Sequence, residues 1–333
     1  MKKLLIPFVP LVLFLVLALF GLFWWNKNSQ NVSQDTRQID FLVVRGRSAS
    51  QIGEGLFDEG LIKDPLAFKI YVQVSGKAAN IQSGQFRISP SYSLVTVVDT
   101  LTKPPAELWV TIPEGLRREE QIERFIKALE ISQAQAEAFR AEFLSESEDF
   151  EGYLFPDTYL FPRTATAKTV VSRMRSTFDL KMKELEKEME ASEFTLEGIV
   201  ILASIIERET RTDDERPVVA GILINRLDID MGLQADATVQ YAVASSSCRA
   251  GEGCNWWPIL TKNDLSINSA FNTYRFRGLP PAPIASPGIS SLMAAANPEE
   301  SEYLYYLHDA EGGIHYAETL SEHNENVRIY LGK

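Results

Sequence analysis

The sequence predicts an α+β protein in three parts: a single N-terminal transmembrane helix, a small α+β domain and a larger mixed α/β domain. At 333 residues the chain is too long for one typical domain. An uncharged apolar run fills residues 4–25. Beyond this run, short apolar stretches typical of strands are mixed with helix-like patterns, and turns rich in Pro and Gly separate them.

The N-terminal run has the length of a membrane span. As a helix, residues 4–25 would measure about 33 Å, close to the hydrocarbon thickness of a bilayer. A cleaved signal peptide is the alternative, but the run exceeds the usual apolar region and no A-x-A-like site follows it. Two lysines precede the span, and Trp24 and Trp25 close it. We therefore expect a single-pass inner (plasma) membrane protein with residues 1–3 in the cytoplasm and the bulk of the chain in the periplasm.

Charge and cysteine content narrow the expected partners. The formal net charge is -12, and the 45 acidic residues are scattered, so nucleic acid is not an expected partner. Cys248 and Cys254 enclose a short loop, for which a disulfide is the favoured interpretation outside the cytoplasm and free thiols are the alternative. No second Cys pair or His-x-His lies near them, so we expect no metal site, and no cofactor motif is evident.

The small domain is expected at residues 41–105, after a polar linker at 26–40. Its expected elements are a strand at 41–44, a helix capped by Ser48 or Ser50 through 52–56, a helix around 68–74, and a strand, a turn at Pro90 and a helix capped near Ser93 between 84 and 101. The pattern V-x-G-x-S-x-x-Q-I-x-x-x-L at 44–56 resembles a LysM repeat, which is a carbohydrate-binding module.

The larger domain is expected at residues 106–333. Its first half is expected to contain a strand and turn at 109–115, helices around 125–129 and 134–143, a charged helix at 170–191 and a buried helix ending near 209. Its second half is expected to contain a helix at 218–227, an extended segment at 231–243, an ordered loop at 271–288 and a helix at 289–296. A buried strand at 303–309 and a last helix leading into 329–331 complete the domain.

The buried helix carries the most distinctive acidic residue. IVILASIIERET, residues 199–210, is almost wholly apolar for eight residues and then becomes charged. Glu207 lies on the flank of Val200 and Ala203, near the C-terminal end of the helix, where carbonyl dipoles and desolvation both disfavour a charged carboxylate. A carboxyl that stays protonated near neutral pH suits a general acid. Glu209 is the nearby rival, but it lies about 200° around the helix, so the two cannot share one face.

The segment EGYLFPDTYLFP, residues 151–162, is rich in aromatic residues and contains two prolines. A helix or a central strand does not accommodate these prolines easily, so we expect a rigid loop packed on the core. The alternative is a cleft wall in which Tyr153 and its aromatic neighbours offer flat faces to sugar rings.

Several stretches together resemble one known family. LASIIERET (202–210), EGYLFPDTY (151–159), LQADATVQYA (233–242) and FNTY (271–274) followed by GLPPAPIASPG (278–288) resemble the YceG-like (MltG) family of endolytic murein transglycosylases. The match covers nearly the whole chain in the expected order. The resemblance implies an inner-membrane-anchored enzyme that cuts nascent peptidoglycan strands internally, leaves 1,6-anhydro-N-acetylmuramic acid ends and so terminates glycan elongation, with peptidoglycan synthases as partners.

The resemblance also assigns residues. Glu207 takes the place of the catalytic glutamate. The residues expected to line the substrate cleft are Tyr153, Gln234, Asp236, Thr238, Asn272, Thr273 and Tyr274. Two departures from the family pattern are Ala237, where proline is common, and the cysteine loop at 245–257, which looks like an insertion.

The chemistry implied by the resemblance needs only one carboxyl group. A lytic transglycosylase protonates the glycosidic oxygen, and the same group then takes the proton of the substrate's C6 hydroxyl, which closes on C1. Two alternatives stay open. One is a non-catalytic peptidoglycan-binding or scaffold protein. The other is a muramidase that uses water, which an aspartate such as Asp236 about 5 to 10 Å from Glu207 would favour.

Overall fold

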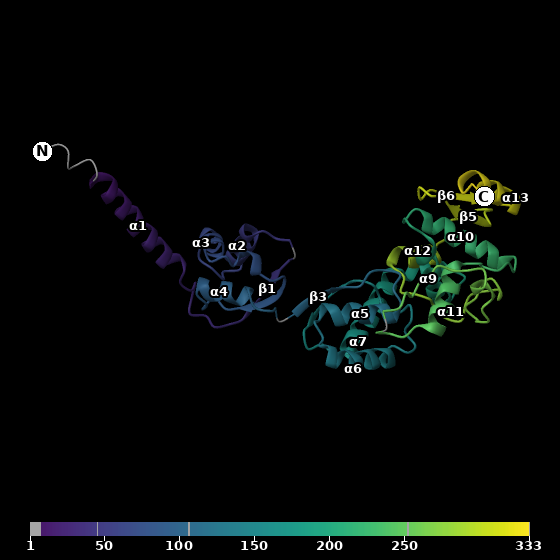
Figure 1. Ribbon diagram of the computed structural model, residues 1–333, viewed down its shortest axis with the longest axis horizontal. Coiled ribbons are helices and arrows are strands. Elements are labelled where there is room, and N and C mark those ends of the chain that lie inside the picture. Colours follow the sequence, from purple (N-terminus) through teal and green to yellow (C-terminus); the bar gives the residue numbers. More distant parts are fainter. Residues whose placement is uncertain (1–7, 45, 106, 252, 333) are drawn as a thin grey trace. The chain divides into compact units, whose positions relative to one another are not determined.

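The computed structural model describes residues 8–44, 46–105, 107–251 and 253–332, and they form two compact units. The first unit comprises the chain up to Trp109 together with Leu160–Arg163. The second comprises Val110–Tyr159 and the chain from Thr164 onward. Figure 1 follows the chain from helix α1, Phe8–Asn28, to helix α13, Leu320–Tyr330. Mixed helices and small antiparallel sheets confirm the predicted α+β class.

Helix α1 is the N-terminal helix of the first unit. Its last tryptophans pack against the core of that unit, with the Trp25 ring 5.6 Å from the Tyr71 ring. Within the described residues, no helix combines the length and the apolar character needed to cross a membrane. The transmembrane helix expected at residues 4–25 is therefore not confirmed, and its first four residues lie outside the described part of the chain.

The first unit packs three helices on an antiparallel pair of strands. Its elements are β1 (Ile39–Val43), α2 (Ala49–Asp58), α3 (Pro65–Val74), a 3-10 turn (Ala78–Asn80), β2 (Gly84–Ile88), α4 (Leu94–Leu101) and the start of β3 (Glu107–Thr111). Phe41 pairs with Phe86 in the β1–β2 register, and both side chains are buried on the helix-facing side, as strand alternation requires. Ser48 and Ser93 cap α2 and α4, as predicted.

The four strands of this sheet follow the order β1-β2-β3-β4. Strand β4, Thr158–Pro162, comes from the aromatic segment in which we expected only a loop. Pro162 is the last residue of this outer strand, where a missing backbone donor costs no ladder hydrogen bond. The segment before it, 151–157, forms turns and irregular backbone, as expected.

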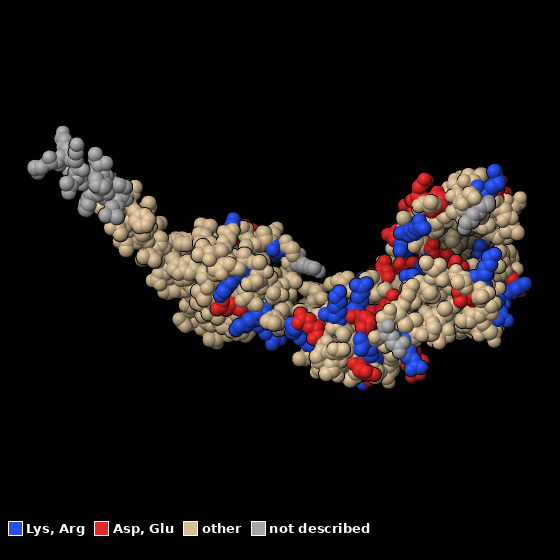
Figure 2. All heavy atoms as spheres, in the orientation of Figure 1, with Lys and Arg blue, Asp and Glu red and all other residues tan. Residues whose placement is uncertain are grey.

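The second unit is mostly helical. Its elements are α5 (Arg118–Ala128), α6 (Gln133–Glu146), α7 (Ala167–Glu184), α8 (Glu186–Ala191), α9 (Leu196–Glu209), α10 (Glu215–Asp228), α11 (Asp236–Ser247), a 3-10 turn (Asp264–Ser266), α12 (Ile289–Ala296), the hairpin β5 (Tyr305–His308) and β6 (Ile314–Ala317), and α13. Figure 1 shows the hairpin and α13 together beside α10. Acidic and basic side chains are intermixed on the face of this unit seen in Figure 2.

Helix α9 is the centre of the second unit. Every residue from Ile199 to Ile206 is buried, and α10, α11 and α12 pack around the helix. Thr195 caps its N-terminus, as predicted. The buried Ser204 hydroxyl accepts the backbone N–H of Ile284 at 3.0 Å, which ties the proline-rich loop to the helix. The loop at 271–288 is ordered without a helix or strand, also as predicted.

Two further elements, both in the second unit, differ from those predicted from the sequence. The extended segment at 231–243 is instead helix α11 from Asp236, and its buried residues Thr238, Val239, Tyr241 and Ala242 follow helical spacing. Packing of this face against α9 outweighs the strand preference of its β-branched residues. The charged helix at 170–191 breaks at Leu185, whose buried side chain joins the core.

Candidate active site

The last turn of α9 presents two glutamates in opposite directions. Glu207 is nearly buried, with its side chain 7% exposed. Its Oε2 accepts the backbone N–H of Gly288 at 3.0 Å and the hydroxyl of Ser291 at 2.8 Å, at the start of α12. Its Oε1 accepts an Arg216 N–H at 3.3 Å. The flank expected to be apolar therefore supplies three hydrogen-bond donors to the Glu207 carboxyl group.

A second carboxyl group shares this side of α9. Glu114, in the turn after β3, fills the space beside Gly288: a Cβ at position 288 would lie 1.9 Å from Glu114 Oε1. Burial raises the pKa of the Glu114 carboxyl, and the charge of Glu207 raises it further. Sequence analysis predicts only a turn at this position, because nothing in WVTIPEG indicates that the turn meets α9.

Glu209 faces a different set of groups. Its Oε2 accepts the hydroxyl of Tyr306 at 2.8 Å, and its Oε1 accepts the Ala237 backbone N–H at 3.5 Å. Burial raises the pKa of the Glu209 carboxyl, and the nearby charge of Asp236 raises it too, although the two hydrogen bonds oppose the change. A raised pKa favours the protonated form of this carboxyl group, which is the form that a general acid uses.

Glu209 lies in the wall of a pocket of about 300 Å³. The other residues that line the pocket are Arg226, Gln234, Asp236, Tyr274, Tyr305, Tyr306, Leu320 and His323. The Tyr274 hydroxyl donates to Asp236 Oδ1 at 2.7 Å, and burial followed by this bond raises the pKa of Tyr274. Burial and then the charge of Arg226 lower the pKa of His323, so its imidazole is neutral at pH 7.

Three predicted cleft residues, Gln234, Asp236 and Tyr274, thus meet in this pocket beside Glu209 rather than Glu207. Thr238 and Thr273 are buried beneath it, with their hydroxyl oxygens 2.9 Å apart. The Thr273 hydroxyl also accepts the Ala235 N–H at 3.0 Å, which fixes the start of α11.

Asn272 is also fully buried, and it holds the FNTY turn together. Its amide donates to the carbonyls of Leu265 and Ile267, and its Oδ1 accepts the Tyr274 N–H at 3.0 Å. Asn272, Thr238 and Thr273 therefore support the pocket and do not line it.

A model of the YceG-like family matches residues 41–329. The chain belongs to the YceG-like family. It is 29% identical over 341 residues to a Bacillus subtilis (strain 168) protein named endolytic murein transglycosylase, covering 95% of this chain and 91% of that protein. A Streptococcus pneumoniae (strain D39) protein of the same name is 26% identical and covers 87% of this chain, which spans 58% of that longer relative.

The fold comparison agrees. The crystal structure of a yceG-like protein from Listeria monocytogenes matches this chain with a TM-score of 0.55 at 29% sequence identity. The match covers 87% of this chain and 99% of that chain. The resemblance predicted from the sequence motifs is therefore confirmed at the level of the family.

Tyr153 lies apart from the other predicted cleft residues in this YceG-like chain. It lines another pocket, with Phe150, Arg175 and Glu197 among its neighbours. Its ring packs edge-on against Phe178, with the ring centroids 5.2 Å apart. The prediction that Tyr153 binds substrate stays a prediction, and the structure places it in a site of its own.

The pocket around Glu209 contains residues that the sequence did not point to. Arg226, Tyr305, Tyr306 and His323 come from α10, β5 and α13. The paired tyrosines of YLYYLHD are the available signal, but the sequence predicts this segment as a buried strand. In β5 only Leu307 is buried.

The disulfide favoured from the sequence is not formed in this YceG-like chain: Cys248 and Cys254 are free thiols, the alternative that the sequence left open. The pKa of Cys248 is raised by burial and by a hydrogen bond with Cys254, so the two sulfur atoms are neighbours. Within the part of the chain that the structure describes, no cluster of three or more His, Cys, Asp or Glu side chains could hold a metal ion.

Proposed function

We propose that this protein is a membrane-anchored endolytic lytic transglycosylase. It would cleave the bond between N-acetylmuramic acid and N-acetylglucosamine in nascent peptidoglycan strands, leave 1,6-anhydro ends and terminate elongation. The names of the Bacillus and Streptococcus relatives support the reaction class. The apolar run at 4–25, the lysines before it and the polar linker at 26–40 support an inner-membrane anchor with the folded units in the periplasm.

One observation carries the choice of catalytic acid: Glu209, whose pKa is raised, lies in one pocket with Gln234, Asp236 and Tyr274. The structure favours Glu209 over the sequence-based choice of Glu207, because the Glu207 carboxylate is already occupied by donors from α10 and the start of α12. We therefore assign proton transfer to Glu209 and a structural role to Glu207.

In the proposed reaction, one carboxyl group acts first as the general acid and then as the general base. Protonated Glu209 donates its proton to the glycosidic oxygen as the C1–O bond breaks, and the oxocarbenium-like state forms at C1. The resulting carboxylate takes the proton of the C6 hydroxyl as that oxygen bonds to C1, so the acid is regenerated and no water is consumed. The Tyr306 hydroxyl, 2.8 Å from Glu209 Oε2, would orient the carboxyl group throughout.

The test is mass spectrometry of the soluble fragments released from purified, uncrosslinked glycan strands by the full-length protein in detergent. Wild type and Glu207→Gln should both release anhydro products, whereas Glu209→Gln should lose at least about 100-fold in rate, the usual contribution of a general acid. Loss of activity in Glu207→Gln alone would return the assignment to Glu207.

The chemical nature of the ends decides between the remaining functions. Reducing ends in place of anhydro ends would mean a hydrolase, with Asp236 as the group that activates water. Intact strands with the wild-type protein, combined with retained strand binding, would mean a peptidoglycan-binding or scaffold protein.

A further inference from the structure

Helix α3 of the first unit has three exposed apolar side chains along its outer face. Leu66, Ile70 and Val74 are four residues apart, so they lie on one side of the helix and form what we call the α3 stripe. They are 56%, 39% and 84% exposed. Phe68 and Val72, on the opposite side of α3, fill the core. Single exposed apolar residues are common, but a row of three indicates a surface that an apolar partner covers.

One edge of the α3 stripe adjoins the end of α1. Tyr71 lies about 60° around the helix from Val74, and its ring is 5.6 Å from the ring of Trp25. Trp24 packs against the same core. Tryptophan and tyrosine side chains gather at the level of the lipid headgroups. If residues 4–25 span the membrane, as proposed, this edge of the stripe lies at that level.

The other edge of the α3 stripe is basic. Lys69 lies on the side of the stripe away from Tyr71, and Lys63 precedes the helix. Both lysines are exposed, and within the described part of the chain neither forms an ion pair. An apolar face bordered by lysines is typical of helices that lie in a membrane surface, where the lysines meet anionic headgroups.

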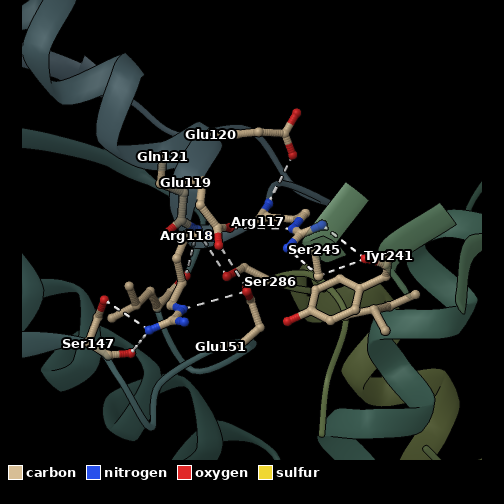
Figure 3. A network of polar contacts seen from close by, with 12 residues as sticks. Arg117, Arg118, Glu119, Glu120, Gln121, Ser147, Glu151, Tyr241, Ser245 and Ser286 are labelled. Carbon is tan, nitrogen blue, oxygen red and sulfur yellow. Dashed lines mark hydrogen bonds and ion pairs between the residues drawn. The ribbon is translucent and has the colours of Figure 1, made fainter. Parts of the chain in front are cut away.

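The distribution of charge along the chain supports the same partner. Residues 26–105 contain 9 basic and 7 acidic side chains, whereas residues 106–333 contain 22 basic and 38 acidic ones. Some of the positive charge of the second unit is also neutralised internally: Figure 3 shows the buried Arg117, whose guanidinium pairs with Glu119 at 3.3 Å. An anionic surface therefore repels the larger domain and attracts the small one.

We propose that the α3 stripe lies in the headgroup region of the membrane that anchors the chain. This inference rests on the anchor in the proposed function. The three apolar side chains would enter the boundary between headgroups and acyl chains, and Lys63 and Lys69 would lie at the phosphates. The small domain would then rest on the bilayer beside the end of α1, in one orientation, and would not turn freely on the linker at 26–40.

The test measures the depth of position 74 in vesicles of phosphatidylcholine and phosphatidylglycerol that contain the full-length protein. Val74→Cys carries a fluorescent label, in a protein whose free thiols are removed by Cys248→Ser and Cys254→Ser. Lipids with a nitroxide near the headgroup should quench this label. Leu42→Cys with the same label is the control and should stay bright, because its neighbours in β1 are buried and it points away from the helices.

Matched substitutions test the stripe itself. Ile70→Gln should reduce the quenching of the label at position 74, because a polar side chain weakens the insertion of an apolar face. Leu42→Gln, which replaces a similarly exposed apolar residue, should leave that quenching unchanged. Lys63→Gln combined with Lys69→Gln should reduce the quenching in vesicles that contain phosphatidylglycerol and not in phosphatidylcholine alone.

Equal quenching of the labels at positions 74 and 42 would overturn the proposal, and so would quenching at position 74 that neither Ile70→Gln nor the double lysine substitution reduces. Flotation of the protein with the vesicles reports the anchor separately. A protein that floats but is not quenched at position 74 retains the anchor and rejects this inference, whereas a protein that does not float rejects both. The measurement needs no cleavage of glycan, so it does not depend on the transglycosylase activity.

Discussion

Replacing Tyr306 with phenylalanine tests the environment of Glu209 directly. The Tyr306 hydroxyl donates to Glu209 Oε2 at 2.8 Å, and this bond lowers the pKa of Glu209 against the effect of burial. A hydrogen bond to a charged group contributes about 1.5–3 kcal/mol and one to a neutral group about 0.5–1.5 kcal/mol. The ionised carboxylate therefore loses about 1 kcal/mol more than the protonated acid, which corresponds to about 0.7 pH unit.

The pH dependence of kcat/KM should show this change. A general acid works while it is protonated, so activity falls as pH rises through the pKa of the free enzyme's acid. Tyr306→Phe should move that alkaline limb upward by about 0.7 pH unit, measured as the rate of release of anhydro ends between about pH 5 and 9. Tyr305→Phe is the control, because its ring packs on His323 and, among the described residues, no hydrogen bond joins its hydroxyl to Glu209. If the alkaline limb of the kcat/KM profile stays in place or moves to lower pH in Tyr306→Phe, Glu209 is not the titrating acid.

Three further outcomes concern the scaffold. Gly221→Ala should destabilise the protein by more than about 2 kcal/mol in chemical denaturation, because its Cβ would lie 2.1 Å from the backbone oxygen of Glu299. Gly288→Ala should lower the free energy of unfolding by less than about 1 kcal/mol, because its Cβ would meet the flexible end of the Glu114 side chain. Equal losses of stability in the Gly221 and Gly288 variants would contradict this reasoning. Burial raises the pKa of Glu151 to about 8 from 4.5, so the folded state holds an extra proton between these values and stability should fall as pH rises through them. Glu151→Gln should flatten that fall, and an unchanged pH profile of the denaturation midpoint would argue against it.

Helices whose starts are marked by a capping side chain, or whose residues form a long apolar run, could be predicted from the sequence. Ser48, Ser93 and Thr195 each accept a backbone N–H at the start of a helix, and a side-chain cap leaves a sequence signature. The apolar run of α9 likewise identifies a buried helix wherever it packs. Helix α11 was missed because its β-branched residues and alternating polar positions are equally typical of a strand, and only contact with α9 decides between them.

The site was harder to predict than the fold. The geometry of α9 required Glu207 and Glu209 to face opposite sides, but it did not say which side holds the pocket. That depends on Tyr306 and Gly288, which lie more than 80 residues further along the chain. The resemblance implies Glu207 as the catalytic glutamate and Gln234, Asp236 and Tyr274 as cleft residues, whereas the structure places these three in a pocket with Glu209.

The hydrogen bonds of Glu207 have a further consequence for the opposite side of α9. They fix the last helical turn against rotation about its own axis, because Gly288, Ser291 and Arg216 hold that side chain from two other helices. A side-chain end lies roughly 6 Å from the axis, so a turn of about 10° would displace the Glu209 carboxyl by about 1 Å. A displacement of that size can cost about 100-fold in rate. If Glu209 is the acid, as proposed, these contacts of Glu207 would hold the reacting carboxyl group in position from the opposite side of α9.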